Sequence, residues 1–169
     1  VGLTPEGAKA LLAEAGYADG FSFGLKCPND RYLNDEAVCQ GVTTMLAQNF
    51  HWNVTGMAFG PLHALFQEIY EDHFAAQDDL AERIKALDGH AVGNLSAMVA
   101  ASKVEEHDGH ATDREMIAAM VAAQKTVSAT LAGAAAVASG HGDLLTEDLC
   151  IGRGQTHDKF AWLLAAHLR

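Results

Sequence analysis

Two histidines lie on either side of a short glycine-containing stretch, and two acidic residues follow further along the chain. His51 and His63 are each six residues from Met57, so in an antiparallel helix pair they can face each other across the connection. Asp78 and Glu82 are four residues apart, which makes them neighbours on one side of a helix. Imidazole and carboxylate donors together suit iron, manganese or zinc. These four side chains are therefore a candidate metal site.

A single chain cannot bring all four side chains to one metal ion. His63 and Asp78 are 15 residues apart, which is about 22 Å along a straight helix. If all four bind the same ion, Asp78 and Glu82 must come from a second copy of the chain. A two-fold axis beside this helix would supply them and would create two equivalent sites per dimer. The simpler alternative, a solvated acidic helix face and a structural histidine, stays open on spacing alone.

Hydrophobic spacing and helix-end residues predict an all-α protein in which one short helix lies between the second and third of four long helices. That arrangement is a four-helix bundle. Asn34 is predicted to cap the first helix, and Thr112 with Glu115 has the pattern of a capping box. The predicted helices are 34–54, 61–87, 95–102, 112–139 and 144–169.

The predicted second long helix has one apolar side. Asp78 lies about 150° from the centre of that side, and His63 and Glu82 also lie outside it. The helix is therefore predicted to bury one face in the bundle and to present the candidate ligands elsewhere. The apolar stripe consists of Leu62, Phe66, Ile69, His73, Leu80, Ile84 and Leu87.

The composition describes one acidic domain. The chain has 169 residues, 49% of them hydrophobic, and a net charge of −11. Such a charge opposes binding to nucleic acid, and no apolar run approaches the roughly 20 residues of a membrane span. The three cysteines form no C-x-x-C pair and indicate no disulfide framework. We expect a cytoplasmic protein with no membrane partner.

The residues around the candidate ligands resemble the Dps family, the mini-ferritins. The resemblance covers residues from about 49 to 169. Its most specific part is the combination of the His-Trp pair, the twelve-residue step to the second histidine and the D-x-x-x-E pair followed by arginine. The runs that carry it are 49–56, 59–63, 78–83 and 157–164.

The resemblance implies a hollow dodecamer of ferritin-like four-helix bundles, with ferroxidase sites between two-fold-related subunits. His51 and His63 would come from one subunit, and Asp78 and Glu82 from its partner. Iron is the implied metal: Fe(II) would be oxidised there by hydrogen peroxide and stored inside as ferric mineral. Neutral imidazoles suit Fe(II), and carboxylates stabilise Fe(III). Trp52 would pack against the ligands or intercept oxidising equivalents; the alternative, a plain buried aromatic, stays open.

The chain departs from the family in two places. Position 67 commonly carries an acidic ligand in Dps proteins, whereas this chain has Gln67 followed by Glu68. Without that carboxylate we expect weaker binding at one of two iron positions, although the Gln67 amide oxygen or a water can still bind. Residues 1–48 resemble a segment of peptide ABC-importer solute-binding proteins. This predicts a composite chain with an atypical segment at 1–33, containing a short helix at 4–16 and a strand-like stretch at 21–27, before a bundle domain at 34–169.

Two further acidic groups resemble metal-binding features. Asp143, Glu147 and Asp148, at the start of the last helix, resemble the family's three-fold pore, through which iron would enter. The same charges would also complement the helix dipole, and both roles are compatible. The tract from Glu105 to His110 has the composition of a metal-binding loop, but ordinary loop composition explains it more simply.

Direct DNA binding, the family's other property, is not expected here. It usually depends on a Lys/Arg-rich tail, and the first 30 residues contain only Lys9 and Lys26. The leading hypothesis is an iron-oxidising storage protein. The alternatives are a ferritin-like shell with weak or no ferroxidase activity, or a composite chain with a non-native head. A haem-containing bacterioferritin-like protein is disfavoured because the E-x-x-H pairs of that architecture are missing.

Overall fold

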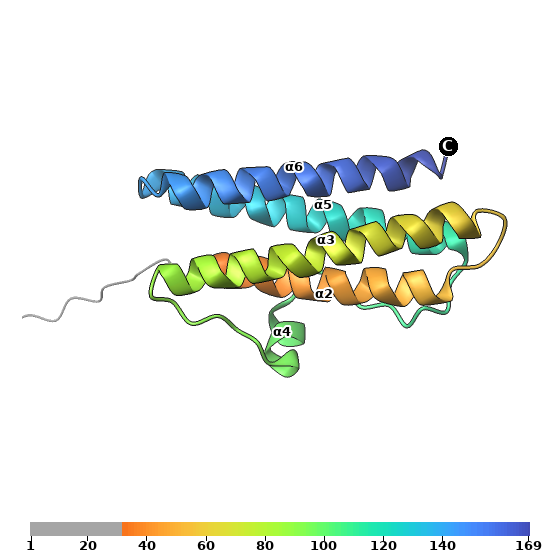
Figure 1. The fold of residues 1–169 in the computed structure, drawn as a ribbon, viewed down its shortest axis with the longest axis horizontal. Coiled ribbons are helices and arrows are strands. Elements are labelled where there is room, and N and C mark those ends of the chain that lie inside the picture. The colour runs from red at the N-terminus through yellow and green to blue at the C-terminus, as the bar shows by residue number, and fades with distance from the viewer. Residues whose placement is uncertain (1–31) are drawn as a thin grey trace, which may run out of the picture.

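The computed structural model describes residues 32–169, and helices are the only regular structure in that range (Figure 1). The predicted all-α fold, with a short helix between the second and third long ones, is confirmed. The helix expected at 4–16 and the strand expected at 21–27 lie outside the described residues. The helices are α2 (Tyr32–Asn53), α3 (Phe59–Ala86), α4 (Leu95–Ala101), α5 (Asp113–Gly140) and α6 (Leu144–Ala166).

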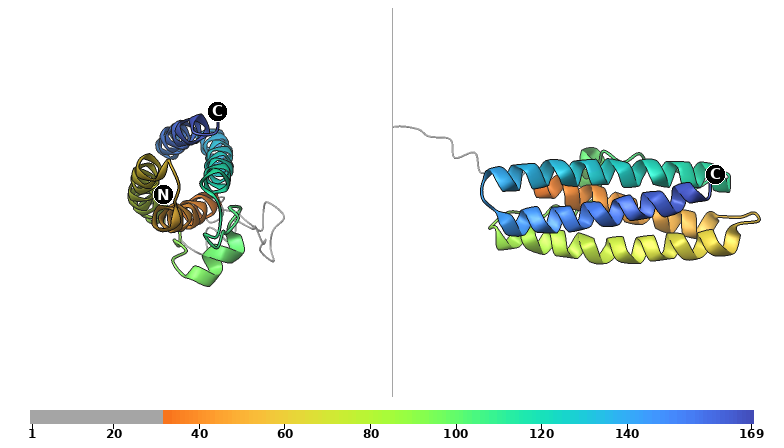
Figure 2. Two further views of the ribbon diagram at one scale, coloured as in Figure 1. Left: turned by 90° about the vertical axis from the view of Figure 1, so that its right-hand side faces the viewer. Right: turned by 90° about the horizontal axis from the view of Figure 1, so that it is seen from above.

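The four long helices form a bundle of two antiparallel hairpins, α2 with α3 and α5 with α6 (Figure 1). The connection from α3 to α5 runs back along the bundle and carries α4 on its way. Seen end-on, the long helices surround a common centre, and α4 lies outside them beside α2 (Figure 2). None of the helices in the described range is long and apolar enough to cross a membrane.

One of the two predicted helix caps is confirmed and the other is wrong. The Thr112 side chain accepts a hydrogen bond from the Glu115 backbone N–H, and the Glu115 carboxylate accepts one from the Thr112 backbone N–H. Asn34 lies inside α2 instead of capping it. Its amide donates to the His90 carbonyl over 2.9 Å and accepts the Val92 N–H over 3.1 Å. The side chain therefore holds the α3–α4 connection against α2.

The predicted apolar stripe of α3 faces the bundle interior. All its members are buried except Leu87, the half-buried residue that ends the helix. Phe66 packs against Phe50 of α2 with ring centroids 5.7 Å apart. The opposite side of α3 is left for polar residues, as the sequence predicted.

A buried polar layer crosses the middle of the core, with one residue from each long helix: Gln40, His73, Gln124 and His157. The Gln124 amide donates to His73 Nε2 over 2.9 Å, and His157 Nδ1–H donates to Gln124 Oε1. His73 Nδ1–H donates to Asp72 over 3.1 Å. Burial lowers the pKa of His157 to about 2 and also lowers that of His73. Both imidazoles are therefore neutral, so each has one nitrogen that can donate and one that can accept.

Two ion pairs join α3 to α6. Arg153 binds the Asp72 carboxylate through both terminal nitrogens, at 2.6 and 3.2 Å. Arg83 lies 2.7 Å from Asp143, the residue that precedes α6. Bidentate Arg–carboxylate contacts have a fixed geometry. Together with the apolar stripe, they set the rotation of α3 about its own axis and hence the face that it presents outward.

Glu36 gives this bundle a measurable pH dependence. Burial raises its pKa from 4.5 to about 8, and its Oε2 has no hydrogen-bond partner in the described range. Between these values the folded state binds more protons than the unfolded state, so the free energy of unfolding falls as pH rises. Glu36→Gln removes this term. We expect the variant's advantage over wild type to grow with pH in that window, by up to about 1.4 kcal/mol per pH unit.

Urea unfolding at fixed protein concentration across this pH range measures that difference. Glu106→Gln, at an exposed position, is the matched control and should run parallel to wild type. A constant difference between Glu36→Gln and wild type would show that Glu36 is ionised in the folded protein.

Candidate metal centre

The two predicted histidine ligands come from adjoining helix ends. His51 lies in the last turn of α2, and His63 lies near the start of α3. The connection between the helices turns at Gly56, whose φ of +96° favours glycine over any residue with a side chain. A Cβ at this position would also lie only 3.3 Å from the Asp113 carboxylate. This short connection places the two histidines beside each other, as the sequence predicted.

The imidazoles of His51 and His63 hold each other in a reciprocal arrangement. The rings stack with centroids 3.7 Å apart and an angle of 20° between planes. His51 Nδ1–H donates to the His63 carbonyl, and His63 Nδ1–H donates to the His51 carbonyl, both over 2.8 Å. No hydrogen bond among the described residues uses either Nε2. Two neighbouring lone pairs are therefore presented together, and a second nitrogen tied to a carbonyl is how protein metal sites commonly orient a histidine.

Aromatic side chains support the pair on both sides. Tyr70 packs edge-on against His51 with centroids 5.3 Å apart. Phe59 stacks against His63 at 5.0 Å. These contacts restrict rotation of the imidazoles, so the Nε2 atoms keep their direction without a bound metal. Neither aromatic residue was singled out in the sequence, because their contacts depend on how the two helix ends pack.

The predicted carboxylate ligands lie elsewhere on α3. Asp78 and Glu82 are both exposed, and neither takes part in an ion pair among the described residues. The helical rise separates them from His63: the 15 residues from His63 to Asp78 span about 22 Å along the axis. The described residues contain no group of three or more His, Cys, Asp or Glu side chains that could hold a metal ion. The two groups of candidate ligands are therefore separate within one chain, and we call them the two half-sites.

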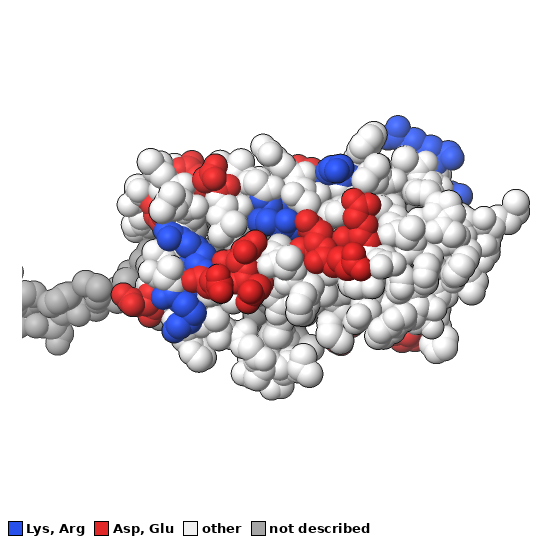
Figure 3. Space-filling model, in the orientation of Figure 1, with Lys and Arg blue, Asp and Glu red and all other residues white. Residues whose placement is uncertain are grey.

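The two half-sites nevertheless share one face of α3. At about 100° per residue, the residues of this face span about 100° around the helix. Acidic side chains gather along α3 in the space-filling view (Figure 3). The face therefore has a histidine end and an acidic end, with exposed Phe74 between them. Its residues are His63, Gln67, Glu71, Phe74, Asp78 and Glu82.

An exposed apolar groove of about 670 Å³ adjoins this face, between α2, α3 and α4. Phe74 is 70% exposed, Met45 60% and Leu95 70%, and all three line it. Met45 lies on the side of α2 that faces this groove. Exposed apolar side chains gathered in a groove mark a surface that binds another molecule.

Trp52 and Gln67, the other residues predicted near the site, are both exposed. Trp52 directly follows His51 and is 66% exposed, so the alternative of a plain buried aromatic does not hold within the described chain. Gln67 lies one turn after His63. Its amide donates to the Glu71 carboxylate over 2.7 Å. Glu71 was not predicted from the sequence, although its four-residue spacing from Gln67 indicates that the two side chains are neighbours on a helix.

The predicted pore residues lie at the start of α6. Asp143 caps this helix by accepting the Thr146 backbone N–H. Partial burial alone would raise the pKa of Asp143, but hydrogen bonds from Thr146 and the positive charge of Arg83 outweigh it and lower that pKa. The helix-capping role is therefore present. Glu147 is half-exposed and Asp148 is exposed, so both remain accessible in the single chain.

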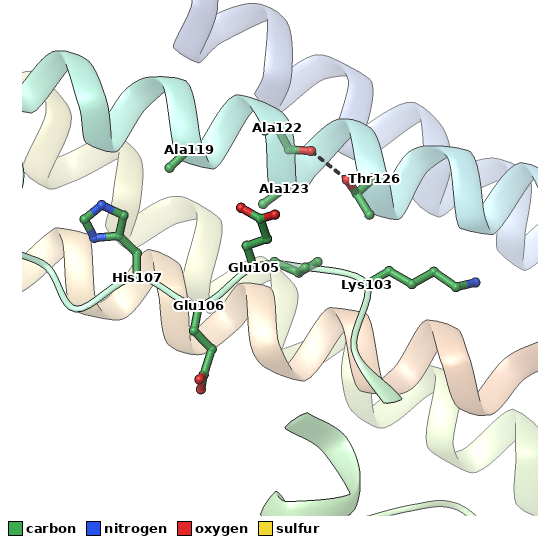
Figure 4. Close-up of a pocket in the computed structure, with 9 residues that line it drawn as sticks. Lys103, Glu105, Glu106, His107, Ala119, Ala122, Ala123 and Thr126 are labelled. Atoms are coloured by element: carbon green, nitrogen blue, oxygen red, sulfur yellow. Dashed lines mark hydrogen bonds between the residues drawn. The ribbon is translucent and has the colours of Figure 1, made fainter. Parts of the chain in front are cut away.

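The tract from Glu105 to His110 lies in the connection between α4 and α5. Glu105 and His107 line a pocket of about 290 Å³ whose far wall is formed by alanines of α5 (Figure 4). His107 Nδ1 accepts the Gly109 backbone N–H over 3.0 Å. Its ring packs against Phe50 at 5.3 Å. These contacts give His107 a structural role in holding the connection on the bundle.

Comparison with known proteins places this arrangement in a family. A model of the ferritin-like domain matches residues 31–169. General stress protein 20U of Bacillus subtilis is 31% identical over 136 residues, which are 80% of this chain and 94% of that protein. DNA protection during starvation protein 2 of Bacillus anthracis is 30% identical over 136 residues, which are 80% of this chain and 93% of that protein. This chain belongs to the Dps family of ferritin-like proteins. The crystal structure of Dps from Staphylococcus aureus superposes on this chain with a TM-score of 0.82 and 30% sequence identity. The superposition covers 85% of this chain and 97% of the Staphylococcus aureus chain.

The match to the ferritin-like domain reaches further toward the N-terminus than the sequence motifs did. It includes residues 31–48, and α2 begins at Tyr32. The expected resemblance of residues 1–48 to a solute-binding protein is not shown by these comparisons. Of the residues predicted for the site, His51 and His63 form the reciprocal pair, Asp78 and Glu82 are exposed, and position 67 carries an amide.

The reciprocal hydrogen bonds fix the tautomers of His51 and His63. Because each Nδ1–H donates to a backbone carbonyl, we expect both neutral imidazoles to carry their proton on Nδ1 in the metal-free protein. Solid-state ¹⁵N NMR at neutral pH measures this, with signals assigned through single substitutions. The exposed His141 and His167 serve as controls and should show mixed tautomers. Protonation of both site histidines on Nε2 would contradict the geometry.

Proposed function

We propose that this Dps protein stores and detoxifies iron by oxidising Fe(II) with hydrogen peroxide at sites shared between two copies of the chain. The observation that supports it is the division of the outward face of α3 into a histidine end and an acidic end. If a second α3 lies antiparallel against the first, the histidine end of each copy meets the acidic end of the other. The midpoint falls near residues 71–74 of the sequence, where exposed Phe74 and the apolar groove provide surface to bury.

The chemistry of the combined ligands suits this reaction. Two Nε2 atoms from His51 and His63 would bind Fe(II), and the carboxylates of Asp78 and Glu82 would favour Fe(III). Two Fe(II) ions each give up one electron, and the O–O bond of hydrogen peroxide breaks as it accepts both. With water, the products are ferric oxyhydroxide and protons. Because peroxide is reduced by two electrons at once, no hydroxyl radical is released.

The assembly that we propose is a hollow dodecamer in which ferric mineral collects, with Asp143, Glu147 and Asp148 near the iron entry. Such an assembly accords with the family to which the chain belongs. We further propose that the protein acts in the cytoplasm without binding DNA directly. The free thiols of Cys39 and Cys150 suit a reducing compartment, and a net charge of −11 repels phosphate.

The specific alternative is a ferritin-like shell with weak or no ferroxidase activity. Gln67 favours it, because an amide replaces a negatively charged ligand beside His63. A weakened second iron position would slow oxidation without changing the assembly.

Anaerobic addition of Fe(II) followed by substoichiometric hydrogen peroxide tests the proposal through the ferric absorbance. Wild type should oxidise iron rapidly and keep it soluble. We expect His51→Ala and Asp78→Ala each to slow the reaction at least about 10-fold, because each removes one donor from the site. The assembly size should not change, since neither side chain belongs to the bundle core or lines the apolar groove.

His141→Ala, at an exposed histidine outside the half-sites, is the matched control and should oxidise iron as wild type does. Wild-type rates in both site variants would remove His51 and Asp78 from the reaction. Oxidation by wild type no faster than in a protein-free solution would support the inactive shell instead.

A further inference from the structure

Three residues of α3 form a row that leads away from the histidine pair. His63, Gln67 and Glu71 follow one another at four-residue spacing, so each step covers about 6 Å along the helix and about 40° around it. All three lie on the outward face that carries the half-sites. Gln67 occupies the middle of the row, one turn from an imidazole on one side and one turn from a carboxylate on the other.

The contact between Gln67 and Glu71 fixes which way the amide points. A carboxylate is an acceptor only, so the group that faces it must be the amide nitrogen. Gln67 Nε2 donates to Glu71 Oε1 over 2.7 Å, a short distance for an N–H···O bond and one expected when the acceptor is charged. The Gln67 carbonyl oxygen is consequently left facing away from Glu71. It is the only metal-binding atom that an amide has to offer.

We propose that Glu71 is a positioning residue of the iron site, which holds Gln67 so that its Oε1 serves as a neutral ligand to the iron bound by His63. This inference rests on the proposed function and adds to it a residue that acts through another. The negative charge of Glu71 polarises the amide and increases the electron density on its oxygen. The site thereby keeps a carboxylate acting on position 67, although that carboxylate does not touch the metal.

Glu71 is less well placed than Gln67 to bind the same metal. It lies two turns, about 12 Å along the axis, from His63, twice the separation of Gln67 from that histidine, and its carboxylate already accepts the Gln67 amide. Glu68 is nearer to Gln67 in sequence but is turned by about 100° around the helix, and no hydrogen bond or ion pair joins it to another described residue. A bridge from carboxylate to amide to metal therefore depends on Glu71. Covering this face with a second copy would exclude water and strengthen the bridge.

Binding of Co(II) to the assembled protein tests this inference without oxidation chemistry, since the absorbance of bound Co(II) reports its ligands. We expect Glu71→Ala to weaken the Co(II) position beside His63 by about 10-fold or more, in the range found when an outer hydrogen-bond partner of a ligand is removed. Glu71→Gln can still accept the hydrogen bond but lacks the charge, so an intermediate loss is expected. Glu68→Ala, the matched control with one fewer carboxylate, should bind as wild type does.

A change at position 67 separates positioning from a general charge effect. In Gln67→Glu the side chain brings its own carboxylate, so Glu71 is no longer needed and repels it at four-residue spacing. Adding Glu71→Ala to this background should leave Co(II) binding unchanged or make it tighter, whereas Glu71→Ala alone should weaken it. Equal losses in Glu71→Ala and Glu68→Ala, or no loss in Glu71→Ala, would overturn the inference.

Failure of the proposed function gives a different result. If wild type shows no saturable Co(II) binding, or if His51→Ala binds as wild type does, the half-site itself is absent and the inference falls with it. If His51→Ala abolishes binding while Glu71→Ala does not affect it, the site stands and only the role of Glu71 is overturned.

Discussion

A helix rises by about 1.5 Å per residue, and that fixed rise governs everything proposed for α3. His63 and Asp78 lie 15 residues apart on one continuous helix, so no side-chain movement can bring them to the same ion. Within residues 32–169 of one chain, the imidazoles of His51 and His63 have no carboxylate partner, and the carboxylates of Asp78 and Glu82 have no imidazole partner. Only a second α3 that runs in the opposite direction can bring the histidine pair of one chain next to the acidic pair of another. The incompleteness of the single chain is thus the reason to infer an assembly.

The interior of the bundle serves this arrangement by fixing the orientation of α3. Six members of its apolar stripe are buried, and the ion pairs from Asp72 to Arg153 and from Arg83 to Asp143 tie the helix to α6. The buried layer that includes His73 adds hydrogen bonds that a rotated helix would lose. Unsatisfied polar groups in a core are costly. The contacts on the inward side of α3 therefore determine which of its side chains face outward. The outward side carries the two half-sites and the exposed apolar surface.

Much of the fold was predictable because helix periodicity and helix ends are local properties of the chain. The stripe of α3 and the capping box of Thr112 and Glu115 needed only near neighbours in the sequence. Asn34 was assigned wrongly because its partners, His90 and Val92, lie more than 50 residues away. The membership of His73 in a polar layer was hidden for the same reason, since the other members belong to three other helices.

The candidate site was predictable to a similar degree. Residue types and spacing predicted that His51 lies beside His63 and that Asp78 and Glu82 lie far from them, because those positions depend on helix geometry alone. The reciprocal hydrogen bonds of His51 and His63 were not predictable, since they depend on the conformation of the loop around Gly56. Glu71 was overlooked because an acidic residue on a helix surface is usually only solvated. Its contact with Gln67 distinguishes it from Glu68.

Each site is proposed to take residues from two chains, and co-assembly of two slow variants tests this sharing most directly. A dimer of His51→Ala with Asp78→Ala contains one doubly defective site and one intact site. Random pairing should therefore restore about a quarter of the wild-type rate of iron oxidation. Mixing His51→Ala with His63→Ala, whose changes lie in the same half-site, should restore nothing. Equal and negligible rates in both mixtures would contradict a shared site.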